Sequence, residues 1–392
     1  MLSHLKVFFS RSEYLATAAG FFLLGFLFGN WATLIPYIKT TFSLNDATLG
    51  LLLLCMPIGT MTFNPVAARL IQKFGLKTMT IFGMIFLSVA YLIPFLITSL
   101  YILPVTLVTV GIGMTMLNIS INILAISLER KYEQFIMSTC HGMFSVGLMI
   151  GSLMRSITLL LEIHEVMHMM LMVLISLLMA MWAIKVISHI NLEQSGHEEK
   201  QAGTRKSLKF TLPSGILLSV IIISICVNFT EGSMTDWASV YMHDVVNTNQ
   251  YFIGWGLFGY SFLMALGRFF GDGLIPVYGR KKILMYGAFL SFLGVLVIIM
   301  FPFTVSAIAG FGMIGLGVSC GSPILYSSAT RISGLSGENG LATMNFYAMA
   351  GFLVGPVIIG FISEISSLPV AFGVIMLLAM VWFYKGMNID LP

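Results

Sequence analysis

Twelve long apolar segments leave this chain with few possible folds. Each is about 20 residues long, enough for a helix to cross the hydrocarbon core of a bilayer. Only 9% of the residues are charged and 58% are hydrophobic, whereas a soluble domain has about 25% charged residues. A soluble enzyme, a nucleic-acid-binding protein and a disordered scaffold are therefore excluded, and we predict an all-α polytopic membrane protein surrounded by lipid. The predicted spans are 15–38, 48–71, 78–98, 101–128, 134–160, 166–188, 213–241, 250–272, 283–301, 304–330, 339–364 and 368–387.

The basic residues predict the orientation of these spans. If the N-terminus is cytoplasmic, all but two of the 20 Lys and Arg residues fall on the cytoplasmic side. The exceptions are Lys39, in an outer loop, and Arg155, within the fifth span. Loops rich in Lys and Arg remain in the cytoplasm. We therefore expect both termini to be cytoplasmic, which requires an even number of spans.

The two halves of the sequence resemble each other. A shift of 204 residues superimposes six glycines of the first half on six of the second. A shift of 206 residues also aligns the tripeptide 30–32 (Asn-Trp-Ala) with 236–238 (Asp-Trp-Ala). Two halves that both begin in the cytoplasm are parallel repeats, typical of transporters with a site between the repeats. The predicted domains are 1–188 and 213–392, joined by a cytoplasmic linker at 189–212. The glycine pairs are Gly50 and Gly254, Gly75 and Gly279, Gly111 and Gly315, Gly113 and Gly317, Gly147 and Gly351, and Gly151 and Gly355.

The loop after the second predicted span carries a family motif. Residues 68–77 read ARLIQKFGLK, which resembles the loop signature of the major facilitator superfamily: a glycine, three residues, an aspartate, a basic residue, any residue, a glycine and a basic residue. Gln72 replaces the aspartate, and Pro276 replaces it in a second copy at 272–281. The resemblance implies twelve helices in two pseudo-symmetric six-helix halves, with cytoplasmic loops that act in gating. The gating residues that it implies are Arg69, Lys73, Gly75, Arg268, Asp272, Gly279 and Arg280.

A narrower resemblance is to the fucose-permease-like branch of that superfamily, with its YbjJ-type bacterial inner-membrane members. The segments that carry it are 25–32 (GFLFGNWA), 141–142 (HG), 231–237 (EGSMTDW) and 267–272 (GRFFGD). It implies a multi-pass transporter in the cytoplasmic (inner) membrane of a bacterium. Fucose permease would be expected to carry proton-handling acids in its first and fourth spans. This chain has no Asp or Glu in either span, so we expect any proton site to lie elsewhere.

Ionisable side chains at membrane depth are candidates for coupling or gating, because a charge in lipid is costly. Glu231 lies about 27 Å along its span, and Asp236 follows near the outer end. A carboxyl in an apolar cavity can hold a proton near neutral pH, as proton-coupled transport requires. Arg155, at a similar depth in the other half, is a gating candidate that could pair with Glu231 or with a charged substrate. His141, near the cytoplasmic end of the fifth span, is a candidate proton relay. The alternative for each is a purely structural ion pair, helix cap or hydrogen bond.

Polar side chains of the first, fourth, seventh and tenth spans are candidates to line a substrate cavity, because these spans line it in the superfamily. Amides and aromatic rings that face one cavity suit a polar, uncharged ligand. The same residue types also hold membrane helices together, so we expect about half of these side chains to be structural. The candidates are Asn30, Trp31, Tyr37, Asn118, Asn122, Asn228, Trp237, Ser322, Tyr326 and, from the eleventh span, Asn345, which is the repeat equivalent of His141.

These observations predict a secondary active transporter, not an enzyme, for a sugar-like or other small polar metabolite. We expect proton symport, no cofactor and a monomer. Proton-coupled efflux of drugs or metabolites is the alternative. Drug antiporters of the superfamily usually carry an Arg in the fourth span and a Gly-Pro motif in the fifth, and this chain has no Arg in its fourth span. A transporter-like membrane sensor is a third possibility, against which the short linker without an added domain argues.

One motif belongs to a different class of protein. Residues 164–168 read HEVMH, the pattern in which two histidines of a zinc protease bind the metal and a glutamate activates water. It lies in the predicted outer turn between the fifth and sixth spans, with no third ligand nearby. We therefore predict no protease and assign no metal, although a weak surface metal site stays open. The four cysteines all lie in apolar segments and are expected to be buried and unpaired.

Overall fold

The computed structural model describes residues 8–190, 213–332, 337–389 and 391. Most of the predicted linker and the side chain of Asp272 lie outside the described residues. Within the described part of the chain, all regular secondary structure is helical, and twelve helices or helix pairs are long and apolar enough to cross a membrane. The predicted all-α architecture with twelve spans is therefore confirmed.

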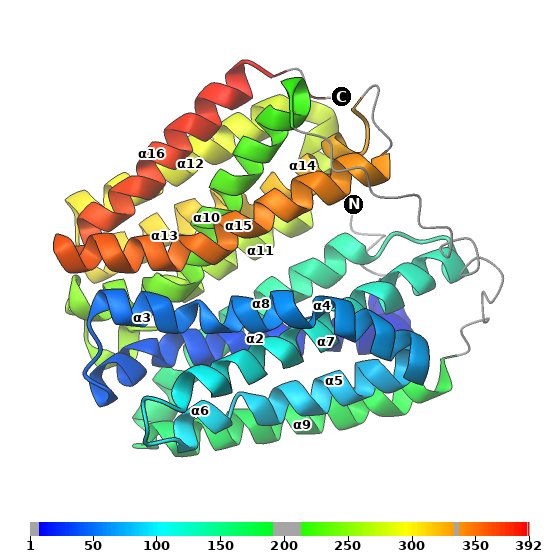
Figure 1. The fold of residues 1–392 in the computed structure, drawn as a ribbon, viewed down its shortest axis with the longest axis horizontal. Coiled ribbons are helices and arrows are strands. Elements are labelled where there is room, and N and C mark those ends of the chain that lie inside the picture. Colours follow the sequence, from blue (N-terminus) through cyan, green and yellow to red (C-terminus); the bar gives the residue numbers. More distant parts are fainter. Residues whose placement is uncertain (1–7, 191–212, 333–336, 390, 392) are drawn as a thin grey trace.

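Six of these spans come from each half of the chain (Figure 1). Those of the first half are α2 (Ser12–Thr41), α3 (Asp46–Leu53) with α4 (Cys55–Phe74), α5 (Leu76–Ala90) with α6 (Ile93–Leu96), α7 (Leu103–Tyr132), α8 (Met137–Leu160) and α9 (Glu165–His189). Those of the second half are α10 (Gly215–Asp244), η1 (Gln250–Phe252) with α11 (Trp255–Tyr278), α12 (Arg280–Met300), α13 (Thr304–Ser319) with α14 (Gly321–Ala329), α15 (Gly337–Ile365) and α16 (Leu368–Met387).

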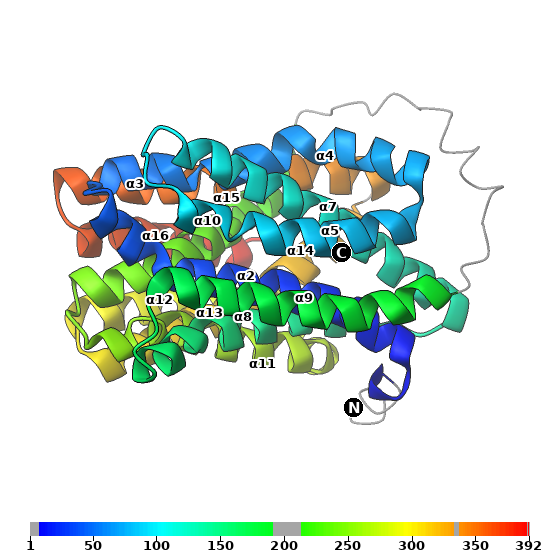
Figure 2. The same ribbon diagram turned by 90° about the horizontal axis from the view of Figure 1, so that it is seen from below.

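Successive spans run in opposite directions, so the bundle has two ends (Figures 1 and 2). We name the end where α2, α8 and α10 begin the linker end, and the end where these helices finish the loop end. In Figure 1 the helices of the two halves lie close together at the loop end, on the left, and diverge toward the linker end. The arrangement is therefore asymmetric across the membrane.

The two halves touch through two equivalent pairs of helices. In one pair α3 packs on α15, and in the other α8 packs on α11. A Cβ added to Gly50 would lie 2.9 Å from the Pro356 carbonyl oxygen, and one added to Gly254 would lie 2.1 Å from the Ser152 carbonyl oxygen. The numbers of Pro356 and Ser152 differ by the same 204 residues as those of the two glycines. The repeat seen in the sequence is thus also a repeat of contacts.

Glycines also bring helices together within each half, as small residues commonly do in membrane proteins. A Cβ added to Gly111 of α7 would lie 2.1 Å from the Met56 carbonyl oxygen of α4. The equivalent atom on Gly315 of α13 would lie 2.0 Å from the Tyr260 carbonyl oxygen of α11. Since Met56 and Tyr260 also differ by 204 residues, both halves use the same close helix crossing.

One part of the predicted repeat is wrong. A Cβ added to Gly151 would lie 3.1 Å from Asn30 Nδ2, and one added to its equivalent, Gly355, would lie 2.9 Å from Ser233 Oγ. The packing therefore makes Asn30 equivalent to Ser233, a shift of 203 residues, and not to Asp236. The shared Trp and Ala residues of the two tripeptides suggested the wrong shift. Identical residue types do not show which face of a helix packs against its neighbour.

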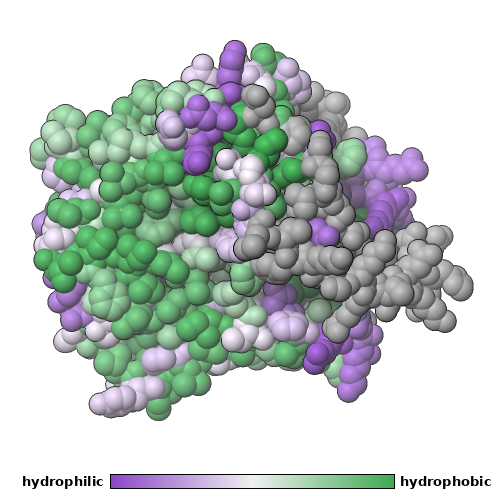
Figure 3. Space-filling view, turned by 45° about the horizontal axis from the view of Figure 1, so that its top comes forward, coloured by the Kyte–Doolittle hydropathy of each residue, from purple (hydrophilic) through white to green (hydrophobic). Residues whose placement is uncertain are grey.

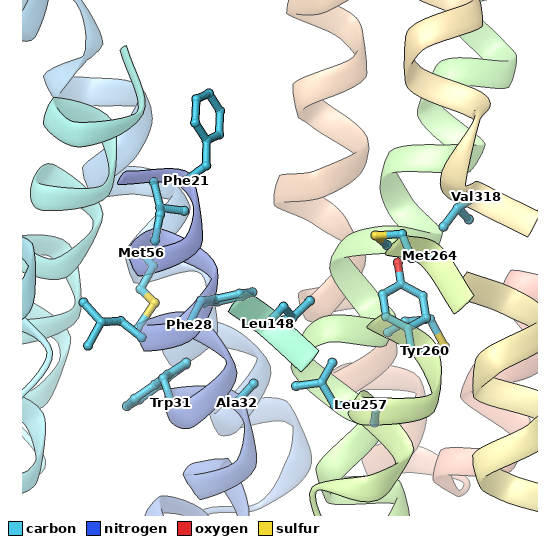
Figure 4. Close-up of a cluster of buried hydrophobic side chains, with 14 of the residues drawn as sticks. Phe21, Phe28, Trp31, Ala32, Met56, Leu148, Leu257, Tyr260, Met264 and Val318 are labelled. Atoms are coloured by element: carbon cyan, nitrogen blue, oxygen red, sulfur yellow. The ribbon is translucent and has the colours of Figure 1, made fainter. Parts of the chain in front are cut away.

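Apolar side chains cover the outside of the bundle as well as its interior. Figure 3 shows hydrophobic residues over much of the face that it presents, and Val105, Leu160 and Val277 are 64%, 70% and 72% exposed. In the interior, Trp31 of α2 and Leu148 of α8 are buried in the main core (Figure 4). An apolar exterior is what lipid tails require, so close packing has to hold the helices to one another.

Candidate functional site

Polar contacts hold the two halves together at the loop end. Lys39 Nζ, at the end of α2, lies 2.5 Å from Asp46 Oδ1 and 2.5 Å from Asp244 Oδ2. Because Asp46 begins α3 and Asp244 ends α10, this ammonium links the first half to the second. Asp46 also accepts a hydrogen bond from the Ser363 hydroxyl and donates its backbone N–H to Glu364 Oε2 at 2.9 Å, both on α15. We name Lys39, Asp46, Asp244, Ser363 and Glu364 the loop-end latch.

A cavity of ≈ 270 Å³ lies between the halves, on the linker-end side of the loop-end latch. Its walls come from α8 of the first half and from α11, α13 and α14 of the second. Three residues predicted to bind solute or relay protons line it, together with one that was predicted to act in a loop. The lining residues are Met137, Ser138, His141, Gly267, Arg268, Gly271, Ile275, Ser319, Cys320, Ser322, Pro323 and Tyr326.

Arg268 of α11 joins the two halves inside this cavity. Its Nη1 donates a hydrogen bond to the Ser145 hydroxyl of α8 at 2.8 Å, and its Nη2 donates to Glu231 Oε1 of α10 at 3.0 Å. The Arg268 and Glu231 side chains are only 13% and 14% exposed. Glu231 lies about 24 Å from the start of α10, and Arg268 lies about 15 Å from the end of α11. A shielded ion pair thus occupies the middle of the membrane-spanning region and contacts both halves.

The position of Arg268 corrects the prediction that it lies in a cytoplasmic gating loop. The predicted eighth span, 250–272, already contained Arg268, and the structure places this residue within the span Gln250–Gly271, ten residues before the end of α11 at Tyr278. The sequence reasoning missed both its partner and the role of Ser145. A glycine just past the last helical residue is a common helix end, so Gly279 was the signal that could have placed the end of α11 at Tyr278.

His141, Ser322, Tyr326 and Asn345 surround the same region with polar and aromatic groups. The exposed ring of His141 lies edge-on to the Phe21 ring of α2, with 5.1 Å between the centroids. The Tyr326 hydroxyl donates to Asn345 Oδ1 at 3.3 Å and so joins α14 to α15. Ser322 lies one turn before Tyr326 and lines the cavity. Hydroxyls, an amide and an imidazole can recognise a polar solute without requiring it to be charged.

Asp236 lies outside this cavity and has a different environment. It follows Glu231 by five residues on α10 and is only 7% exposed. Among the described residues it has no hydrogen-bonding partner and no ion pair. Tyr91, at the end of α5 in the first half, lies within electrostatic range of Asp236. The Tyr91 hydroxyl donates to Met114 Sδ at 3.6 Å and therefore does not satisfy the carboxyl.

Arg155 does not pair with Glu231. Its Nη2 lies 2.5 Å from Glu165 Oε1, and its Nη1 donates to the Ile163 carbonyl at 2.7 Å. Both partners lie at the loop end, where α8 turns into α9. This ion pair fixes a turn within the first half and reaches neither the cavity nor the second half.

The HEVMH motif is not arranged as a metal site. Its Glu165 is held by Arg155, and the ring of His168 is buried with Nδ1 2.8 Å from the Thr158 hydroxyl. The side chain of His164 is 69% exposed. Within the described ranges of the chain, no group of three His, Cys, Asp or Glu side chains could hold a metal ion. The four cysteines are free.

The remaining predicted cavity residues do not line the cavity. The four asparagines bond within their own helices, whereas Asn30 Oδ1 and Trp31 Nε1 are buried without a hydrogen-bonding partner among the described residues. Their contacts are Asn30 Nδ2 to the Phe26 carbonyl at 2.8 Å, Asn228 Nδ2 to the Ser224 carbonyl at 2.8 Å, Asn122 Nδ2 to Asn118 Oδ1 at 2.6 Å, Trp237 Nε1 to the Pro356 carbonyl at 3.2 Å, the Trp31 ring to the Phe95 ring at 5.8 Å and the Tyr37 ring to the His164 ring at 6.3 Å.

Apart from Arg268 and Asp272, the predicted gating residues lie at the linker end. Gly75 and Gly279 end α4 and α11 with φ of 87° and 79°, a region of backbone conformation that favours glycine. Arg69 and Lys73 are exposed on α4, and the Lys73 ammonium lies 5.1 Å from the centroid of the Phe74 ring. Arg280 begins α12. A role of these residues in gating stays a prediction.

Comparison with known proteins agrees with this architecture. The family described as Major Facilitator Superfamily matches residues 17–337. The chain is 30% identical over 367 residues to an uncharacterised MFS-type transporter of Yersinia pestis, covering 94% of this chain and 93% of that protein.

Solved transporter structures share the fold at low sequence identity. The nucleoside transporter NupG has a TM-score of 0.73 at 13% identity, over 96% of this chain and 98% of that chain. A bacterial homologue of the human lysosomal transporter Spinster, inward-facing and occupied, has a TM-score of 0.71 at 13% identity, over 95% of each chain. FucP in the outward conformation has a TM-score of 0.61 at 16% identity, over 97% of this chain and 100% of that chain. These likenesses concern the fold, and the narrower fucose-permease-like branch stays a prediction.

Proposed function

Because this chain belongs to the major facilitator superfamily, we propose that it carries a small polar solute across the cytoplasmic membrane of a bacterium by alternating access, in symport with protons. The observation that carries the proposal is Arg268, which contacts the first half through Ser145 and the second through Glu231 inside a cavity between them. A solute bound there competes for contacts that both halves make. Its binding is therefore linked to the movement of one half against the other.

The described conformation corresponds, in this proposal, to the one that faces the cytoplasm. The basic residues predict that the linker end is cytoplasmic, and the loop end is closed by the latch and by the α3–α15 and α8–α11 contacts. The TM-scores support the same assignment, since the inward-facing Spinster homologue scores 0.71 and the outward FucP structure 0.61. The solute would leave the cavity toward the cytoplasm.

The charges around the cavity favour an electrically neutral solute. Glu231 would repel an anion that approached Arg268, and Arg268 would repel a cation that approached Glu231. Arg268 also holds the hydroxyl of Ser145, and a hydroxyl of the solute could take the place of this group. Tyr326 offers an aromatic face for the less polar side of such a molecule. A sugar-like or other polyhydroxylated metabolite fits these conditions best.

The first experiment is a thermal-shift screen of the purified protein at two pH values. The candidates are sugars, sugar acids, amino acids, nucleosides and cationic drugs. A solute at 100 times its Kd stabilises the folded state by about 2.7 kcal/mol. We expect hits among neutral polar metabolites. Hits confined to lipophilic cations would contradict the proposal and favour efflux.

The second experiment measures transport in proteoliposomes with the best solute. We expect an inward proton gradient to drive its accumulation, and Arg268→Met to lower exchange of the solute at least about tenfold, because charged hydrogen bonds contribute about 1.5–3 kcal/mol each. Lys185→Met, at the exposed linker end of α9, is the matched control and should transport normally. Loss of transport in both variants, or in neither, would contradict the role of Arg268.

A further inference from the structure

The buried carboxyl of Asp236 has no role in the cavity described above. It lies about 12 Å from the loop end of α10 and about 7.5 Å beyond Glu231 along the helix axis. The residue is only 7% exposed, and no described residue forms a hydrogen bond or ion pair with it. An ionised carboxylate in such a place is unfavourable, because no described cation compensates for the hydration that it loses. Burial of this kind favours the neutral, protonated form of a carboxyl.

The groups on the neighbouring helices leave Asp236 without a partner. α10 packs against α2, α11, α13, α14, α15 and α16. Lys39 of α2 is paired within the loop-end latch, and Arg268 of α11 is paired with Glu231. Glu364 of α15 accepts a hydrogen bond from the Asp46 N–H.

The other neighbouring helices supply no partner either. α13 has no ionisable residue, and the Tyr326 hydroxyl of α14 donates to Asn345. Tyr384 and Lys385 of α16 lie at the linker end. From the first half, Tyr91 interacts electrostatically with the carboxyl.

The location of Asp236 couples protonation of its carboxyl to the movement of the two halves. Its carboxyl lies in the second half, whereas Tyr91 belongs to the first, so the site is formed where the halves meet on the loop side of the cavity. When the loop end opens, the halves separate there and water can reach the carboxyl, which can then ionise. When the loop end closes, the carboxyl must be protonated before it is buried.

We infer that Asp236 is the proton-binding site of this transporter and that closing the loop end takes up a proton from that side of the membrane. The inference rests on the alternating-access function proposed above and moves the coupling role from Glu231 to Asp236. Glu231 is the weaker candidate because its carboxylate is already paired with Arg268. Because the closed state binds one more proton than the open state, closure is favoured at low pH and is lost as pH rises.

The experiment measures the opening of the loop end directly. Cysteines are placed at Tyr101, which is 92% exposed in the first half, and at Ile365, which is 84% exposed in the second, in protein whose Cys55, Cys140, Cys226 and Cys320 are serine. Spin labels on this pair report the distance across the loop end between pH 5 and pH 8.5. With one proton taken up, the ratio of open to closed molecules should rise by up to about tenfold per pH unit.

Three variants test whether the pH response of this distance comes from Asp236. Asp236→Asn should remain closed at every pH, because its side chain is neutral and similar in size. Glu162→Gln removes an exposed carboxylate at the same end and should respond as the parent does, and Glu231→Gln should keep the pH response. An unchanged response in Asp236→Asn, a response lost in Glu231→Gln, or no response in the parent would each overturn the inference. Monodisperse elution of each variant shows that it is folded.

The outcome is separable from that of the transport proposal. The distance measurement needs no solute, so a parent protein that accumulates a solute but shows no pH response would overturn the role of Asp236 alone. A parent that responds through Asp236 but transports none of the candidate solutes would instead contradict the proposed function.

Discussion

Arg268 and Glu231 stabilise the folded protein only as a pair. Removing the arginine alone leaves a carboxylate that is 14% exposed without its cation, and breaking a buried ion pair in this way costs about 3–5 kcal/mol. We therefore expect Arg268→Met to lower the thermal unfolding temperature of the purified protein clearly. The double variant Arg268→Met/Glu231→Gln removes the unpaired charge and should recover most of the loss.

Solute binding provides the control for this prediction. If Arg268 contacts the solute, binding should remain lost in the double variant although its thermal stability returns. Equal destabilisation of the single and double variants would show that the arginine acts through packing and not through its charge.

At the residue scale, the sequence located charged side chains within the spans but did not predict their partners. Glu231 and Arg155 were recognised because each interrupts an apolar segment. Their partners depend on which helix faces carry them and which helices are neighbours. Arg155 lies near the short turn between α8 and α9, and Glu165 at the start of α9 is therefore within its reach. Glu231 instead faces α11, whose Arg268 was assigned to a loop.

The loop-end latch joins elements that are distant in sequence. Lys39 at the end of α2 holds the start of α3 and the end of α10, and all three side chains are at most 30% exposed. Lys39→Met leaves two carboxylates close together. We expect this to weaken closure by about 1 kcal/mol, the upper range for partly exposed pairs, and to raise the open-to-closed ratio about fivefold in the Tyr101 and Ile365 distance measurement.

Salt provides an independent check on the latch. At 1 M ionic strength the Debye length falls to about 3 Å, so high salt should favour opening in the parent protein. Lys39→Met should be less sensitive to salt than the parent. An identical salt response in both would mean that the latch does not hold the loop end.

At the element scale, the number of spans was predictable because lipid imposes both length and apolarity on every helix. Their internal breaks were not predicted. The second span is divided into α3 and α4 at Leu54, and the tenth into α13 and α14 at Cys320. Each break comes three residues before a proline, Pro57 and Pro323, and proline is a residue that interrupts helices. The predicted eighth span ended at Asp272, whereas α11 continues through mostly apolar residues to Tyr278.

At the scale of the whole molecule, alternating access requires the two halves to touch and separate at the loop end. The glycines of the repeat allow that contact: Gly50 meets α15 and Gly254 meets α8. The sequence revealed these glycines as a repeat, but it did not reveal that this pair lies between the halves while Gly111 and Gly315 act within them. The equivalent contacts of Gly50 and Gly254 make closure a property of the symmetric interface as well as of the latch.

Gly254→Leu tests this interface. A Cβ at this position would lie 2.1 Å from the Ser152 carbonyl oxygen of the other half, a clash that only separation of the backbones can relieve. Overpacking typically costs about 1–3 kcal/mol, so the open-to-closed ratio should rise at least about fivefold, with a longer distance between labels at Tyr101 and Ile365. Gly373→Leu on α16, where an added Cβ meets no atom within 4 Å, is the matched control and should behave as the parent does. If Gly254→Leu leaves the distance unchanged, the halves do not move apart at the α8–α11 contact, and a rocking movement about the cavity would have to be replaced by a more local gate.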